Sequence, residues 1–200
     1  RGTGLGLSIC YGIIQEHEWT KEGSYLRPRI QRLGLDKNIG KGRIYRLVHD
    51  GFTPGPQPHL LETSTSELVG YLDHPNGWWR DNAQKLLVIR GDQSVGPALK
   101  KMALGQHSFW KKAPSALGRI HALWTLEGLN AIDKNTLYQA FNDEDPQVRK
   151  TAVWISERYI KQNDEEMLAK LEPLVSDTSA DVKIQLGLSL RYGSSPKAQV

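Results

Sequence analysis

Four short stretches of similar character recur along the chain at intervals of 39, 30 and 34 residues, beginning at Trp79, Gly118, Val148 and Val182. Each has a cation at its second position and a small or apolar residue three positions later, on the same face of a helix. Intervals of this length are typical of arrays built from one repeated helical hairpin. Because a single hairpin cannot bury its own apolar stripe, the repetition predicts that neighbouring hairpins stack.

Apolar periodicity divides the repeated region into alternating first and second helices. First helices are expected at roughly 65–72, 94–104, 134–142 and 164–175. Second helices are expected at roughly 77–90, 114–130, 146–161 and 180–191. Asp, Asn, Ser and Pro in the turns before the second helices are suited to helix caps and first turns. The sequence therefore predicts an all-α fold, an α-solenoid of about four helix pairs over residues 64–192, with Ala83, Ala122 and Ala152 facing the core.

The eight residues 145–152, Asp-Pro-Gln-Val-Arg-Lys-Thr-Ala, resemble the HEAT-repeat family. Units of that family have two antiparallel helices, and a turn of the Asp-Pro type leads into a second helix beginning Val-Arg-x-x-Ala. The first repeat departs from this pattern with Trp78-Trp79, and the last has Lys183 in place of arginine. The resemblance implies a scaffold that binds protein, and it assigns no catalytic residue.

The N-terminus places alternating glycines before an apolar helix expected at about 7–17, and such a loop can expose backbone N–H groups to a phosphate. The stretch resembles the last glycine box of the ATP-binding domain of sensor histidine kinases. In that family the phosphate-loop residues would be Gly2, Thr3, Gly4 and Gly6. The resemblance covers residues 1–17, and the other boxes of such a domain would lie upstream, so we expect no ATP binding.

Residues 42–48, Gly-Arg-Ile-Tyr-Arg-Leu-Val, alternate in the manner of a β-strand. Together with residues 11–16, 19–27 and 35–41, they resemble the end of a glucose/sorbosone-type dehydrogenase β-propeller. These bacterial proteins join a propeller to helical repeats, and they are periplasmic or membrane-associated. The resemblance implies a quinone cofactor (PQQ) for a full-length relative and none for this fragment, because the quinone-binding and sugar-binding residues belong to earlier blades.

Composition divides the chain into three parts. Residues 1–17 are the kinase-like glycine-box fragment, residues 18–60 are the propeller-end-like segment with a Pro-rich linker, and residues 61–200 are the HEAT-like repeat domain. We expect residues 1–60 to be short and irregular, with one helix and one or two strands. The chain begins with Arg1, and we interpret it as a piece of a longer protein. Residues 11–16 fit both N-terminal resemblances, so the join between them is natural or artificial.

Residue usage argues against several kinds of site. The single cysteine, Cys10, rules out an internal disulfide and a Cys-rich zinc site, and the six histidines are not at metal-ligand spacing beside a carboxylate. No apolar run approaches the roughly 18 residues of a membrane span. Residues 1–60 hold 9 Lys/Arg and 5 Asp/Glu without a recognised nucleic-acid module, so we expect no nucleic-acid partner. We expect neither a catalytic residue nor a metal in this chain.

Five residues are candidates for structural or interaction roles: Trp78, Trp79, Arg80, Arg119 and Arg149. A helix cannot bury two consecutive tryptophans on one face, so we expect one inside and one exposed. The helix dipole disfavours a cation in the first turn, so each repeated arginine needs a partner.

The partners expected from sequence proximity form a ladder of polar contacts between repeats. They are carboxylates or open backbone carbonyls of an adjoining repeat, with Asp73 or Asp81 near Arg80, and Asp143, Asp145 or Asp181 near Arg149. Arg119 has the fewest carboxylates nearby in the sequence.

The leading functional hypothesis is a non-catalytic scaffold segment of a larger bacterial membrane-associated sugar dehydrogenase-like protein. Its partner would be another protein or a neighbouring domain of the same chain. Two alternative hypotheses stay open. In the first, the chain is part of a quinone-dependent glucose/sorbosone-type oxidoreductase that acts through absent propeller blades. In the second, it is an ATP-binding fragment of a histidine kinase.

Overall fold

A computed structural model describes residues 23, 25–34, 37, 50–51, 53, 55–106 and 112–194. The chain divides into two compact units, Arg1–Gly55 and Pro56–Val200. Among the described residues of the first unit, the structure has the helix α2 (Leu26–Arg32), which the sequence did not predict. Its last turn carries Arg29 and Arg32, whose charges are favourable at a helix C-terminus. The expected helix at about 7–17 and the expected strand at 42–48 lie outside the described residues.

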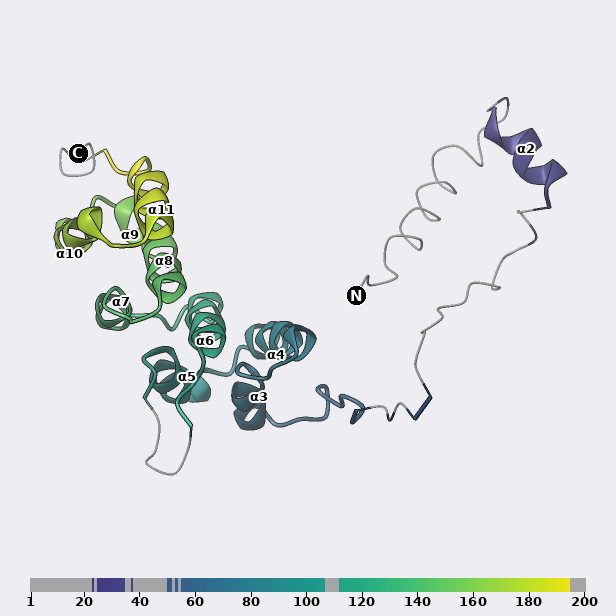
Figure 1. Ribbon diagram of the computed structural model, residues 1–200, viewed down its shortest axis with the longest axis horizontal. Coiled ribbons are helices and arrows are strands. Elements are labelled where there is room, and N and C mark those ends of the chain that lie inside the picture. Colours follow the sequence, from purple (N-terminus) through teal and green to yellow (C-terminus); the bar gives the residue numbers. More distant parts are fainter. Residues whose placement is uncertain are drawn as a thin grey trace. The chain divides into compact units, whose positions relative to one another are not determined.

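The second unit consists of two rows of helices, which Figure 1 shows from α3 to α11. The first-helix row contains α3 (Thr65–Tyr71), η3 (Gln93–Val95) with α5 (Gly96–Ala103), α7 (Lys134–Ala140), and α10 (Glu165–Leu171) with η4 (Glu172–Ser176). The second-helix row contains α4 (Gly77–Arg90), α6 (Ala116–Gly128), α8 (Pro146–Ile155) with α9 (Glu157–Ile160), and α11 (Ala180–Leu190). No strand occurs in the part of the chain that the structure describes, and the prediction of an all-α fold is confirmed.

Helices pack within pairs and between pairs. Helix α3 packs on α4, α5 on α6 and α7 on α8, while η4 connects α10 to α11. Along the second-helix row, α4 packs on α6, α6 on α8 and α8 on α11. We number these pairs as repeats 1 to 4. The arrangement is compatible with the α-solenoid that the sequence predicts.

Three second helices, α4, α6 and α8, begin at residues whose side chains cap them. The carboxylate or amide oxygens of Asn76 and Asp145, and the hydroxyl of Ser115, accept hydrogen bonds from backbone N–H groups of the first helical turn. In the second unit, α4, α5, α6 and α9 are each followed by a residue with left-handed backbone: Gly91 (φ 64°), Gly105 (φ 66°), Asn130 (φ 55°) and Asn163 (φ 54°). Glycine and asparagine are the residues that adopt this conformation most readily, so they end the helices at these positions.

Small residues occupy the centre of the stack. Ala83, Ala122 and Ala152 are fully buried, as the periodicity predicts. They are joined in the core by large aliphatic side chains, among them Leu72, Leu87, Leu126 and Val148. The core therefore runs continuously from repeat 1 to repeat 4 between the two rows.

Two expected helices are interrupted. The single helix expected at 146–161 ends at Ile155, and α9 begins two residues later. Between them, the buried hydroxyl of Ser156 donates to the carbonyl of Val153 at 2.6 Å, and this competes with regular helical geometry. The helix expected at 164–175 changes to a 3-10 helix at Glu172, just before Pro173, which has no N–H to donate to the preceding turn.

Candidate functional site

Two of the repeated arginines form buried ion pairs with the next repeat, and we name these contacts the arginine ladder. Arg119 Nη2 lies 3.0 Å from Asp143 Oδ1, and the two side chains are 8% and 11% exposed. Arg149 binds Asp177 through two parallel bonds, Nε–Oδ2 at 2.8 Å and Nη2–Oδ1 at 2.7 Å. Each pair joins the first turn of one second helix to the turn that precedes the following second helix.

The ladder carboxylates also organise their own turns. Asp143 Oδ1 accepts from the backbone N–H of Asp145, and Asp177 Oδ1 accepts in the same way from Ser179, both at 2.8 Å. The hydrogen bond from Arg149 is the main cause that lowers the pKa of Asp177 below its ordinary value. The same hydrogen bond raises the pKa of Arg149. Both residues are therefore held in their charged forms.

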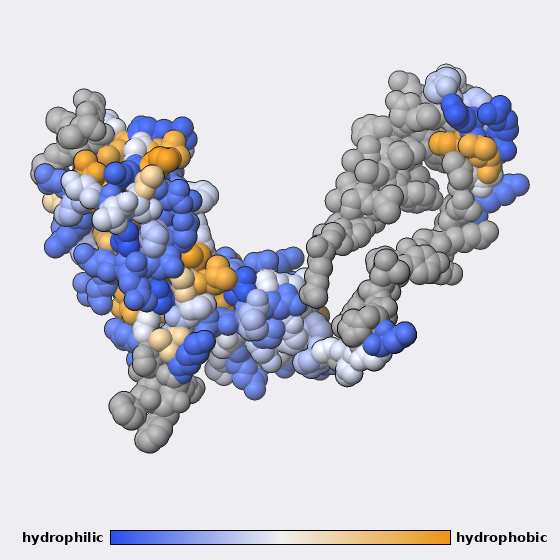
Figure 2. Space-filling model, viewed as in Figure 1, coloured by the Kyte–Doolittle hydropathy of each residue, from blue (hydrophilic) through white to orange (hydrophobic). Residues whose placement is uncertain are grey.

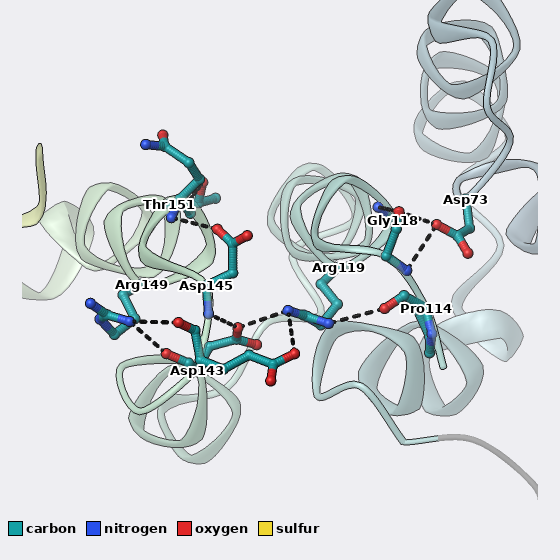
Figure 3. Close-up of polar contacts among 11 residues, drawn as sticks. Asp73, Pro114, Gly118, Arg119, Asp143, Asp145, Arg149 and Thr151 are labelled. Carbon is teal, nitrogen blue, oxygen red and sulfur yellow. Dashed lines mark hydrogen bonds and ion pairs between the residues drawn. The ribbon is translucent and has the colours of Figure 1, made fainter. Parts of the chain in front are cut away.

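The guanidinium groups also bind backbone carbonyls of the turn in their own repeat (Figure 3). Arg119 Nη1 donates to the carbonyl of Pro114 at 3.0 Å. Arg149 Nη1 donates to the carbonyls of Asp143 at 2.8 Å and Glu144 at 3.2 Å. Each arginine thus connects two consecutive turns, and its chemistry is that of a structural cross-link.

Several expected carboxylate partners are wrong, and the backbone carbonyls that the arginines bind belong to their own repeat and not to an adjoining one. Arg80 pairs with neither Asp73 nor Asp81 in the structure, because its Nη1 donates to the carbonyls of His74 and Pro75 at 2.7 and 3.1 Å. The carboxylate partner of Arg149 is Asp177 and not one of the acids nearby in sequence. Arg119, with the fewest acids nearby in sequence, has a buried carboxylate partner from repeat 3. The stack places the next turn beside each arginine, and sequence proximity does not show this.

The junction between repeats 1 and 2 uses a different carboxylate. Asp73 Oδ1 accepts hydrogen bonds from the backbone N–H and the hydroxyl of Ser115. A Cβ atom at Gly118 would lie 2.6 Å from Asp73 Oδ1 and 2.9 Å from its Cβ atom, so only glycine allows this close approach (Figure 3). Here the acid belongs to the earlier repeat, whereas in the arginine ladder it belongs to the later one.

A second set of ion pairs joins the first helices, and the sequence reasoning missed it. Lys100 Nζ lies 2.6 Å from Asp133 Oδ2, and Lys134 pairs with Asp164. Burial acts to raise the pKa of Asp133, but hydrogen bonds from Lys100 and Thr136 lower it. Asp133 and Asp164 are the N-caps of α7 and α10, and that role is the sequence signal that could have identified them.

The two consecutive tryptophans separate as expected. Trp79 packs against the core, and its ring stacks on His74 with centroids 4.8 Å apart. Trp78 is about half exposed. Of the two, Trp78 is therefore the one whose ring is available to a partner.

Other exposed apolar side chains occupy equivalent positions on the second helices. Leu117 precedes Arg119 by two residues, as Trp78 precedes Arg80, and both are about half exposed. Trp154 and Leu188 each lie five residues after the repeated cation, and they too are about half exposed. We define the second-helix apolar row as Trp78, Leu117, Trp154, Ile184 and Leu188. Figure 2 shows apolar areas at the α11 end of a mainly hydrophilic surface.

A partly buried tryptophan, Trp124, packs against the exposed Trp154 of the apolar row. Trp124 occupies in α6 the position that Trp154 occupies in α8, and the two rings pack edge to face with centroids 5.3 Å apart. Trp124 itself packs against the core. This contact fixes the orientation of Trp154, so the exposed ring is held in place before any partner arrives.

The kinase-like candidates Gly2, Thr3, Gly4 and Gly6 lie outside the described residues. Within the described residues, no three His, Cys, Asp or Glu side chains come together as a metal site. None of the helices in the described segments is both long enough and apolar enough to cross a membrane.

No protein-family model matches the chain, and no curated protein matches it.

Proposed function

We propose that residues 64–192 are a HEAT-like scaffold that binds a protein segment through the second-helix apolar row. The observation that carries this proposal is the exposure of Trp78 and Leu117 at one repeat-equivalent position of repeats 1 and 2, and of Trp154 and Leu188 at a second such position of repeats 3 and 4. Single exposed apolar side chains are ordinary on protein surfaces. An exposed side chain that recurs at the same position of successive repeats is less ordinary, because stacking brings these positions next to one another.

Two physical properties support a protein as the partner. Tryptophan contributes strongly to protein–protein binding, because its large ring buries much area with few rotatable bonds. The ion pairs of the arginine ladder hold the second helices in register, since both partners of each pair are largely buried. A preorganised row loses little conformational entropy on binding. The partner is a separate protein or a neighbouring domain of the same chain.

A crosslinking experiment tests the proposal. A photoreactive amino acid replaces Trp154 in one variant and Gln139, an exposed residue of α7, in a control variant. We expect one crosslinked product from position 154 and none from position 139. Mass spectrometry of the product distinguishes a separate protein from residues 1–55 of the same chain.

The affinity of the identified partner then decides the role of the row. We expect Trp154→Ala to weaken binding by at least about tenfold, which corresponds to about 1.4 kcal/mol. The matched control Gln139→Ala should leave the affinity unchanged. Equal crosslinking from both positions, or equal affinities of the two alanine variants, would contradict the proposal.

The wider context rests on the resemblance of residues 11–48 to the end of a sugar dehydrogenase propeller. In this proposal the scaffold is one segment of a larger bacterial membrane-associated protein whose propeller carries the quinone. Sequencing the coding region upstream of Arg1 tests it. Propeller blades would support the context, and a kinase domain would contradict it.

A further inference from the structure

Arg80 differs from the other two repeated arginines, because it has no carboxylate partner among the described residues. Its Nη1 donates to two backbone carbonyls, those of His74 and Pro75. Its Nε is shielded from solvent and has no acceptor, as is also true of Arg119 Nε, but its Nη2, unlike that of Arg119, makes no hydrogen bond with a described residue. The guanidinium is thus left with neutral acceptors at Nη1 and unused donors at Nε and Nη2.

This arrangement is electrostatically incomplete. Arginine keeps its charge throughout the range in which proteins fold, and a partly buried charge is stabilised when an opposite charge accompanies it. The same side chain has a carboxylate oxygen at 3.0 Å in Arg119 and at 2.7 Å in Arg149. Arg80 is the member of the series whose counter-charge is missing.

The sequence explains why repeat 2 supplies no acid. The ladder carboxylates Asp143 and Asp177 lie six residues before Arg149 and Lys183, whereas the residue six positions before Arg119 is Ala113. The nearby acid Asp73 is already bound to Ser115, because its Oδ1 accepts hydrogen bonds from both the backbone N–H and the hydroxyl of that residue. The described part of the array therefore does not provide this carboxylate.

Space is available beside the guanidinium. Gly77 lies next to it, and a Cβ atom at that position would lie 3.3 Å from Arg80 Nη2. Since glycine has no Cβ, this side of Nη2 is not covered by residue 77. A ligand oxygen can approach from here.

We propose that Arg80 is a binding site for a carboxylate group that comes from outside the array. The ligand oxygen binds Nη2, in the role that Asp143 and Asp177 perform for Arg119 and Arg149. An acidic side chain of a bound protein segment and a small organic acid share this chemistry. The site is independent of the second-helix apolar row, because it requires only the guanidinium and the space beside Gly77.

A titration of the full chain tests the site. The Nε–Hε signals of Arg80 and Arg149 are followed by NMR, with Arg80→Lys used to identify the first signal. The probes are sodium acetate and a capped tripeptide with a central aspartate, at constant ionic strength maintained with sodium chloride. We expect a saturable shift at Arg80 with a midpoint below about 100 mM, which is at least tenfold below the 1 M standard state. Arg149, each of whose three nitrogen atoms already donates to an acceptor, should not shift.

Two glycine variants provide a matched comparison. Gly77→Ala places a methyl group beside Nη2 and should raise the midpoint at least threefold. Gly70→Ala makes the same change where no heavy atom lies within 4 Å, and it should leave the midpoint unchanged. A tenfold preference for the tripeptide assigns the carboxylate to a protein segment, and equal midpoints assign it to a small acid. An unsaturable drift, an equal shift at Arg149, or an unchanged midpoint in Gly77→Ala would overturn the proposal.

Discussion

The Arg149–Asp177 pair should contribute measurably to the stability of the stack. Its side chains are 13% and 6% exposed, and two short charge-assisted hydrogen bonds connect them. Each such bond contributes about 1.5–3 kcal/mol, so the two together contribute about 3–6 kcal/mol. Fixing the arginine side chain costs up to about 2 kcal/mol of rotamer entropy. We therefore expect a coupling free energy of about 1–4 kcal/mol between the two residues.

A double-mutant cycle measures this coupling. The variants are Arg149→Ala, Asp177→Ala and the combination, and urea unfolding followed by far-ultraviolet circular dichroism gives each free energy of unfolding. Either single replacement leaves a buried charge without its partner, so each should cost about 3 kcal/mol. The double variant should cost less than the sum of the two single variants, by the coupling energy. The dependence of the free energy on urea concentration should stay constant across the set.

The Lys100–Asp133 pair provides the control, because its N–O distance is 2.6 Å while its side chains are 38% and 47% exposed. Solvent screening should reduce its coupling to less than about 1 kcal/mol. A coupling below about 0.5 kcal/mol for Arg149–Asp177, or equal couplings for both pairs, would refute the reasoning from burial. Arg149 would then be a surface residue in energetic terms and a candidate for partner binding.

Three further predictions concern packing and pH. Gly118→Ala should lower the free energy of unfolding by about 1–3 kcal/mol, because the added methyl group overpacks against Asp73. Gly187→Ala, with no neighbour within 4 Å, should raise the free energy of unfolding by up to about 1 kcal/mol. Urea melts of both variants check that the two changes have opposite signs. The lowered pKa of Asp177 gives a contribution to stability that is complete above about pH 3.9 and is lost as the pH falls through the lower folded value, so Asp177→Asn should flatten the acid limb of stability against pH. Burial lowers the pKa of His121, so stability should decrease as the pH falls below about 6.5, and a slope that persists in His121→Gln would contradict this assignment.

The sequence predicts the helices well because their signals are local. Asp145 and Pro146 supply a cap and a first helical residue, and α8 begins at Pro146 as expected. Ser156 is an ordinary residue in a helical pattern, and its buried hydroxyl bond to Val153 depends on the packing around it. Periodicity therefore locates the helix and does not locate its interruption.

The candidate site is less predictable because its contacts are not local. Arg149 and Asp177 are separated by 28 residues, and only the stacking of repeat 4 on repeat 3 brings them together. The shared spacing of six residues between an acid and a following cation is visible in the sequence at Asp143 and Asp177. The spacing alone does not show that each acid pairs with the cation of the preceding repeat. Among the described residues, Arg80 lacks such a partner because the equivalent position of repeat 2, six residues before Arg119, is Ala113.

The arginine ladder makes the junctions of the array unequal, and this gives the array a direction of opening. Repeat 1 is joined to repeat 2 through the contacts of Asp73 with Ser115 and of Gln84 with His121, without the arginine–carboxylate pair found at the two later junctions. In an array whose repeats contact only their neighbours, local opening begins at the weakest junction. Backbone amides of α3 and α4 should therefore exchange with deuterium sooner than those of α6 and α8. A carboxylate bound at Arg80 would stabilise the closed form of repeat 1, in which the site is formed, so occupancy of one side chain would slow exchange across a whole repeat.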